Sequence, residues 1–137
     1  MIRATLLAFA MAVATAAEAS AWKKIAVSAD GLVTFYADTG SMTQRGAFHR
    51  FRLLYDYRQA QQDPDDLTSS QSMTVLASID CRQQLLGVER LIRYSANMAQ
   101  GAIVSRSPAE KKIAYRKVAP GSIDEQTLKF VCGKAST

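Results

Sequence analysis

The stretch Ser72-Met73-Thr74-Val75-Leu76-Ala77-Ser78-Ile79-Asp80-Cys81 alternates in side-chain character and ends in a cysteine. In an extended strand successive side chains point to opposite sides, so every second residue shares a face. One face of this stretch then carries Met73, Val75, Ala77, Ile79 and Cys81. The alternation predicts a β-strand with one buried face, and it places the cysteine at the end of that face.

Similar patterns lie on both sides of this strand. Residues 22–27 and 32–37 flank Ser28-Ala29-Asp30-Gly31, and Asp-Gly between two β-rich runs is a strong hairpin signal. Residues 47–57 alternate, and His49, Phe51, Leu53, Tyr55 and Tyr57 share one face while Arg50 and Arg52 lie on the other. The pattern predicts three further antiparallel strands, with a turn at residues 38–41 and an exposed loop over residues 58–70.

Alternation continues after Cys81. Over residues 84–95 it places Leu86, Val88, Ile92 and Tyr94 on one face, and Arg90 falls on that same face. Shorter strands are expected at residues 102–105 and 112–118. Together these segments predict one antiparallel sheet.

The carboxyl end has helical periodicity instead. Ser122 followed three residues later by Glu125 is the signature of a capping box, in which each residue satisfies a free amide of the other. Leu128, Val131 and Cys132 share a helical face, and Gly133 is placed to end the helix. The predicted fold class is therefore α+β: an antiparallel β-sheet with a C-terminal helix, near residues 123–132, packed on it.

The first 21 residues have the features of a secretory signal peptide. Arg3 is their only basic residue, residues 4–17 carry no charge, and Ala19-Ser20-Ala21 supplies small residues for cleavage. A membrane anchor would need roughly 20 apolar residues, more than this run contains. We expect export and cleavage after Ala21, which leaves one domain at residues 22–137 without a transmembrane segment. The periplasm is the expected location, with secretion or surface association as alternatives.

The chain contains two cysteines, Cys81 and Cys132. An even number of cysteines in an exported chain predicts a disulfide. Metal-binding or redox thiols are the alternative, but there is no CxxC motif and His49 is the only histidine. A Cys81–Cys132 bond would hold the helix against the sheet, and closing this loop would stabilise the fold by about 4 kcal/mol.

Motifs for catalysis are missing from the sequence. There is no HExxH, GxSxG, P-loop or dinucleotide fingerprint. His49 is the one candidate general base, and its place beside Phe51 on an apolar face favours a packing role. Asp63, Asp65 and Asp66 lack calcium-loop spacing, which favours a solvated loop. We therefore expect no enzyme activity, no metal and no cofactor, although a glycosidase-type carboxylate pair would meet only in space and stays open.

The densest basic cluster consists of Lys111, Lys112, Arg116 and Lys117. Strand alternation would turn Lys112 and Arg116 outward, away from Ile113 and Tyr115. With a net charge of +5 and a pI near 9.4, such a patch would attract a protein or an anionic envelope or matrix component. A solvated face without a ligand is the alternative. Export and the absence of a recognition motif argue against nucleic acid.

Five motifs follow one another along the mature chain: Phe35-Tyr36-Ala37-Asp38, Ser78-Ile79-Asp80-Cys81, Tyr94-Ser95-Ala96-Asn97-Met98 with Gly101, Val118-Ala119-Pro120-Gly121-Ser122, and Phe130-Val131-Cys132. In order, spacing and identity this set resembles the surface-adhesin protein E-like family of Gram-negative envelope proteins. The resemblance implies an antiparallel sheet with a C-terminal helix and a disulfide, and a function in binding proteins or envelope components.

Two features depart from the pattern of that family. The founding adhesin is a surface-displayed lipoprotein, whereas residues 1–21 contain no cysteine to acylate. Tyr115 stands where the family often carries tryptophan. The resemblance therefore implies export and binding without implying surface display. A structural or stress-related periplasmic protein without a host ligand is the alternative function.

Overall fold

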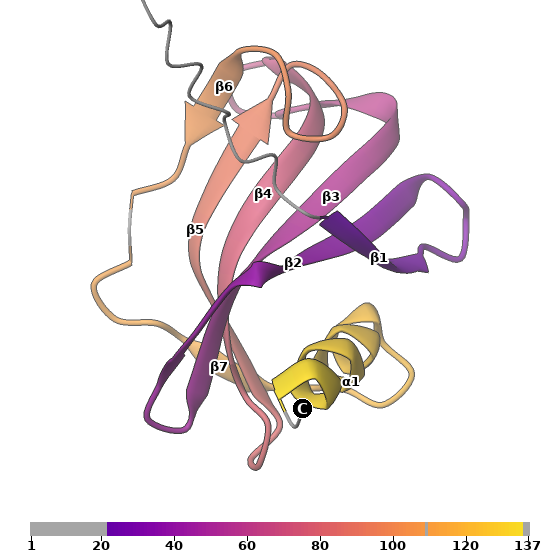
Figure 1. Cartoon of the computed structure of the whole chain (residues 1–137). Helices are drawn as coiled ribbons and strands as arrows, with labels where there is room; N and C mark the ends of the chain where they lie inside the picture. The colour runs from indigo at the N-terminus through magenta and orange to yellow at the C-terminus, as the bar shows by residue number, and fades with distance from the viewer. Residues whose placement is uncertain (1–21, 109, 136–137) are drawn as a thin grey trace, which may run out of the picture.

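The computed structural model describes residues 22–108 and 110–135, which form seven strands and one helix (Figure 1). The predicted signal peptide, residues 1–21, lies outside the described part of the chain. The elements are β1 (Trp22–Val27), β2 (Val33–Arg45), β3 (Phe48–Gln62), β4 (Ser69–Asp80), β5 (Leu85–Tyr94), β6 (Ile103–Arg106), β7 (Tyr115–Lys117) and α1 (Ile123–Ala135). The predicted α+β class, an antiparallel sheet with a C-terminal helix, is confirmed.

The sheet is an antiparallel meander in which strands that follow one another in sequence are neighbours. Its order is β1-β2-β3-β4-β5-β6, and β7 pairs with the same side of β5 as β6 does, at residues 85–87 rather than 92–94. Between these two pairings, the amides of Ser107 and Glu110 donate to the carbonyls of Leu91 and Glu89. This side of β5 is thus covered over most of its length, which protects it from pairing with another chain.

The turn predicted at residues 38–41 is wrong, because β2 continues through it to Arg45. Turn chemistry is nevertheless present: Asp38 Oδ1 accepts the Gly40 amide at 3.1 Å, and Ser41 Oγ donates to the Asp38 carbonyl at 2.9 Å. The pairing of β2 with β3 shifts register here, between Asp38 and Thr43. Since β3 pairs with β2 on both sides of the irregularity, these residues make a bulge instead of reversing the chain.

The loop predicted over residues 58–70 is also shorter than expected. Strand β3 extends to Gln62 and β4 begins at Ser69, so residues 63–68 alone connect them. The Asp63 amide donates to the Thr68 carbonyl at 2.8 Å and closes this turn. The polar side chains do not prevent pairing, because a sheet ladder is made by the backbone and an exposed hairpin tolerates polar residues on both faces.

The core lies between α1 and one face of the sheet. It contains Ala37, Phe51, Leu53, Val75, Ala77, Ile79, Leu86, Leu128 and Val131, all buried. The apolar face predicted for the strand that ends at Cys81 is therefore confirmed. Figure 1 shows α1 on one side of the sheet, near β1 and β2. In the part of the chain that the structure describes, no helix is long and apolar enough to cross a bilayer.

Helix α1 begins where the sequence predicts and ends three residues later, because Gly133 lies within it. Ser122 Oγ accepts the Glu125 amide at 3.2 Å, which confirms Ser122 as the N-cap. The reciprocal half of the capping box is wrong. The Glu125 carboxylate instead pairs with Lys129 Nζ at 3.0 Å, one helical turn further on.

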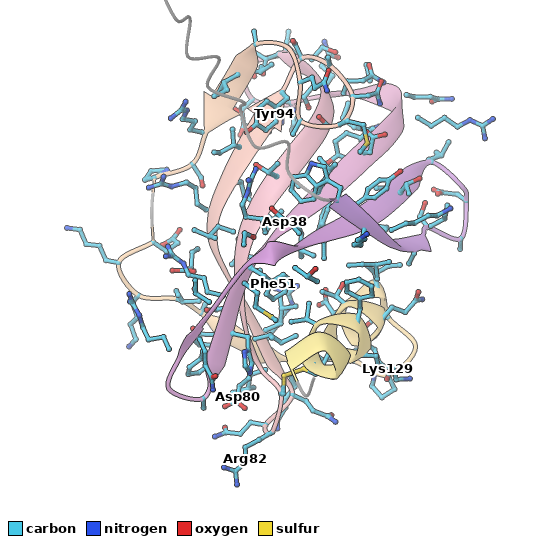
Figure 2. All side chains as sticks on the ribbon, viewed as in Figure 1. Asp38, Phe51, Asp80, Arg82, Tyr94 and Lys129 are labelled. Atoms are coloured by element: carbon cyan, nitrogen blue, oxygen red, sulfur yellow. A yellow bond between two sulfur atoms is a disulfide. The ribbon has the colours of Figure 1, made fainter. Side chains whose placement is uncertain are left out.

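The predicted disulfide is confirmed. Cys81 and Cys132 are bonded across 51 residues of sequence with their Cα atoms 5.8 Å apart. Figure 2 shows this bond at the end of α1, close to the turn that carries Asp80 and Arg82. The bond joins the carboxyl end of β4 to the helix at the position next to Val131, which is fully buried.

Removing the disulfide by Cys81→Ala/Cys132→Ala should lower the free energy of unfolding by about 4 kcal/mol, because the unfolded chain regains the entropy of a long open loop. Urea unfolding followed by circular dichroism measures this change. The reduced wild-type protein should unfold at the same midpoint as the double variant. Equal midpoints for the oxidised and reduced wild type would contradict the prediction.

Candidate functional site

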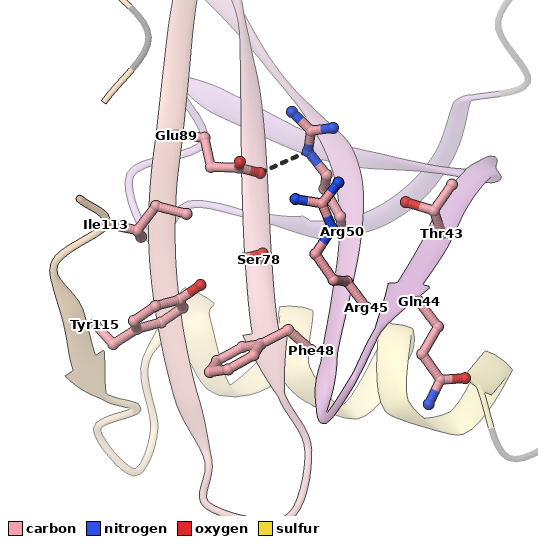
Figure 3. Close-up of a pocket in the computed structure, with 9 residues that line it drawn as sticks. All are labelled: Thr43, Gln44, Arg45, Phe48, Arg50, Ser78, Glu89, Ile113 and Tyr115. Carbon is pink, nitrogen blue, oxygen red and sulfur yellow. Dashed lines mark hydrogen bonds and ion pairs between the residues drawn. The ribbon is translucent and has the colours of Figure 1, made fainter. Parts of the chain in front are cut away.

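The face of the sheet opposite α1, called the outer face below, carries two clefts. The larger, the arginine cleft, has a volume of about 410 Å³ (Figure 3). It is lined by residues from β2, β3, β4, β5 and the segment that leads into β7: Thr43, Gln44, Arg45, Phe48, Arg50, Ser78, Glu89, Ile113 and Tyr115. Arg50 and Ser78 are opposite each other in the register of β3 and β4, so their side chains share this face.

Gly87 determines the wall of the arginine cleft that Ile113 and Tyr115 form. A Cβ atom at Gly87 would collide with Ile113 Cγ2 and would lie 2.9 Å from Tyr115 Cδ1. The missing side chain therefore lets both residues lie directly on β5. Tyr115 in turn stacks on Phe48, with 4.6 Å between ring centroids and 32° between ring planes. Tyr115 is thus part of an aromatic wall of the cleft.

Charge in the arginine cleft comes from Arg45, Arg50 and Glu89. Arg50 Nε donates to Glu89 Oε2 at 2.7 Å, and the two side chains are 44% and 20% exposed. An ion pair this exposed adds little to stability, so its main effect is to hold the guanidinium group in place. Arg45 is exposed, and Figure 3 shows it extending over the cleft from β2. The cleft therefore presents two guanidinium groups and one carboxylate.

A bulge in β5 brings Glu89 to this face. Leu76 pairs with Arg90 and the next residue, Ala77, pairs with Val88, so Glu89 is an extra residue in the ladder. Leu86 and Val88 face the core as predicted. The prediction that Arg90 and Ile92 share their face is wrong, because the bulge turns both residues to the outer face. A strict period of two cannot reveal this switch, because one inserted residue exchanges the two faces.

The predicted basic cluster is divided by the structure. Arg116 Nη2 pairs with Asp124 Oδ2 at 2.8 Å, and Lys117 Nζ donates to the Gln83 carbonyl at 2.7 Å. Both side chains thus hold β7 to its neighbours. Lys111 and Lys112 are exposed in the segment before β7, beside Ile113 of the arginine cleft. Strand β7 begins only at Tyr115, so the predicted strand from residue 112 is too long.

Sequence reasoning placed Arg50 and Arg52 on the outer side of their strand but did not identify them as a site. Arg45 was missed because the predicted turn at residues 38–41 hid the second half of β2. The available signal was the spacing of Arg50 and Arg52, two residues apart on a strand whose other face is apolar.

The residues considered for catalysis and metal binding lie in strand pairings, ion pairs and hydrogen bonds that support the fold. His49 is half buried on β3, opposite Gln44 and Ile79 in the register. Asp63 Oδ2 pairs with Arg93 at 2.6 Å, and hydrogen bonds from Thr68 lower the pKa of Asp66. Within residues 22–108 and 110–135, no three His, Cys, Asp or Glu side chains are grouped to hold a metal ion.

The motif from Tyr94 to Gly101 includes a loop that is hydrogen-bonded to the central strands β3 and β4. The Met98 amide donates to Asp56 Oδ1 at 2.7 Å, and the Ala99 amide donates to Ser72 Oγ at 2.9 Å. Met98 and Ala99 have φ angles of 59° and 57°, and Gly101 has 76°. A non-glycine residue with positive φ is strained, so these hydrogen bonds hold a loop shape that the chain alone disfavours. The motif thus has a structural role.

Replacing Gly87 by alanine should lower the free energy of unfolding by about 1–3 kcal/mol, because the new methyl group displaces Ile113 and Tyr115 from β5. Thermal unfolding measures the loss, and near-ultraviolet circular dichroism reports on the Phe48–Tyr115 pair. Gly133→Ala is the control. A Cβ there meets no atom within 4 Å, so helix propensity should raise stability by about 0.5–1 kcal/mol. A Gly87→Ala protein as stable as the wild type would disprove this account of the cleft wall.

Comparison with known proteins gives a consistent result. A family model described as surface-adhesin protein E matches residues 22–133. Crystal form II of Haemophilus influenzae protein E superposes with a TM-score of 0.63 at 16% identity, covering 95% of this chain and 100% of that one. Protein E from non-typeable Haemophilus influenzae gives 0.61 at 16% identity, covering 92% and 84%. At this identity the structures establish a shared fold. No curated protein sequence matches the chain.

Proposed function

We infer the function from one premise: the chain belongs to the surface-adhesin protein E family. We propose that it is an exported, non-enzymatic envelope protein that acts by binding proteins or envelope components. The observation that carries this proposal is the arginine cleft, an open site with two guanidinium groups on the face that α1 leaves uncovered. Its groups suit recognition of an anionic partner.

The exposed lysines extend this proposed binding site. Lys111 and Lys112 are exposed and directly precede Ile113, which lines the arginine cleft. Arg116 and Lys117 contribute through structure: their bonds to Asp124 and to the Gln83 carbonyl position β7, and with it Tyr115. Of the basic cluster in the sequence, Lys111 and Lys112 are the pair proposed to meet a partner.

Binding through this site should be salt-sensitive, because exposed charges are screened over about 10 Å at 0.1 M salt. We expect the processed protein to retain envelope or matrix components from an extract at low salt and to release them at high salt. Lys111→Ala/Lys112→Ala should reduce retention severalfold. Lys23→Ala/Lys24→Ala is the matched control, since it removes two exposed lysines from β1 at the edge of the sheet. Equal loss in both variants would mean that net charge alone acts.

The alternative is a structural or stress-related periplasmic protein without a host ligand. The ion pairs Arg50–Glu89 and Arg116–Asp124 favour it, because they already compensate part of the positive charge. In that case both lysine variants would behave as the wild type in every binding assay.

Location separates binding within the envelope from adhesion to a host. We expect the processed protein to be recovered with the soluble periplasm when cells are fractionated, and to survive protease treatment of intact cells. Periplasmic recovery directs the search to envelope partners. Digestion of the protein on intact cells would contradict the periplasmic proposal and would favour adhesion to a host.

A further inference from the structure

We propose that the outer face binds a linear acidic polysaccharide through Arg45, Arg50, Arg52 and Arg90. The inference deepens the proposed function and rests on it, since it names the class of envelope or matrix component that the site takes. It starts from a second cleft of about 170 Å³, lined by Arg52, Thr74, Val75, Leu76, Arg90 and Ile92. Two clefts on one face are each lined by two arginines.

The strand register places the arginines of the two clefts in one continuous row, called the track below. Arg50 and Arg52 are two residues apart on β3, so their Cα atoms are about 7 Å apart. Arg52 is opposite Leu76, which is opposite Arg90, so Arg52 and Arg90 are two strands, about 10 Å, apart. Arg106 is opposite Ile92 and continues the series on β6. The guanidinium groups therefore recur across the sheet at intervals that suit a polymer with repeated anionic groups.

Four carboxylates of this face, on Asp38, Asp56, Asp80 and Glu89, keep their negative charge but are less exposed than Arg45, Arg50 and Arg90. Glu89 pairs with Arg50, and three further carboxylates accept backbone amides: Asp38 from Gly40, Asp56 from Met98, and Asp80 from Arg82 and Gln83. Asp38 and Asp80 are buried, whereas Arg45, Arg50 and Arg90 are exposed. A ligand that lies on this face therefore meets mainly guanidinium groups.

Two of the four arginines are held in position before any ligand binds. Glu89 orients Arg50, and the Arg52 guanidinium carbon lies 5.1 Å from the ring centroid of Trp22. A guanidinium group held in this way can form two parallel hydrogen bonds to a carboxylate or sulfate without losing much further rotational freedom. Lysine has no such planar fork. All four positions on the track are arginine.

The shape of the site favours a polysaccharide over a peptide or a lipid. On the face of a sheet the backbone groups are used in the ladder, so an extended peptide could not add as a strand there. The clefts have volumes of about 410 and 170 Å³, and each is lined by two arginines, which suit an anionic chain better than an acyl chain. Recognition must come from side chains alone, through charge for the anionic groups and through the Phe48 and Tyr115 rings for the sugar rings.

The test uses the processed, oxidised protein and titration calorimetry at low salt. The probes are a hexasaccharide of polygalacturonate, which carries carboxylates, and a heparin-derived hexasaccharide, which adds sulfates. Maltohexaose is the neutral probe. We expect both acidic probes to bind, maltohexaose not to bind, and Arg45→Ala/Arg90→Ala to weaken binding about tenfold or more. Arg45→Lys/Arg90→Lys should also weaken binding, because it keeps the charge but removes the fork.

The single variant Arg90→Ala, which removes one guanidinium group, has a matched control in Arg82→Ala, at the β4–β5 turn and away from the centre of the outer face (Figure 2). The Arg82→Ala protein should bind both acidic probes as the wild type does. Equal weakening by Arg82→Ala, or full binding by the double lysine variant, would reduce the effect to net charge and overturn the assigned track. Thermal unfolding checks that each variant is folded.

Two further probes test the class of ligand. Hexaglutamate stands for an acidic peptide, and phosphatidylcholine vesicles with phosphatidylglycerol stand for an anionic membrane. Tighter binding of either, lost in Arg45→Ala/Arg90→Ala, would replace the polysaccharide with that class. If extract components still bind but no acidic sugar does, the inference fails and the proposed function stands. If nothing binds in any assay, both fail.

Discussion

The Cys81–Cys132 disulfide joins the end of β4 to the buried side of α1, and the core depends on this attachment. In the described part of the chain, α1 is the only helix. Its Leu128 and Val131 pack against the buried apolar side chains on one face of the sheet and complete the core. A domain this small buries a modest fraction of its surface, so a covalent tie between sheet and helix supplies stability that packing alone would not.

One helix also explains why a face of the sheet is open. Helix α1 has 13 residues and is roughly 20 Å long, whereas six neighbouring strands span about 24 Å. It can cover one side of such a sheet and no more. The other side is therefore covered by its own side chains, and exposed arginines there lie beside buried residues such as Leu54 and Thr74. The arginine cleft follows from the way the core is closed.

Local irregularities then give the open face its detail. The bulge at Glu89 turns its carboxylate toward Arg50, the irregularity after Asp38 lets β2 reach Arg45, and Gly87 admits the segment with Tyr115. Each is a small departure from a regular ladder that aims one side chain at the cleft. At 16% identity the likeness to Haemophilus influenzae protein E shows a shared fold.

The sequence was sufficient to predict the α+β class, the strand that ends at Cys81 and the N-cap at Ser122, because residues close together in the chain encode each of them. The disulfide was predictable because the chain has two cysteines and they can pair in one way. Strand ends and the candidate site were not accessible in this way. Glu89 follows Arg50 by 39 residues, and the one local sign of the bulge that exchanges the faces of β5 is the charged Arg90 on an otherwise apolar face. Arg116, predicted to face outward in a candidate binding patch, is exposed and pairs with Asp124, a contact that the sequence pattern did not indicate. Register and tertiary pairing decide such contacts, since they depend on which strands meet and not on any single segment.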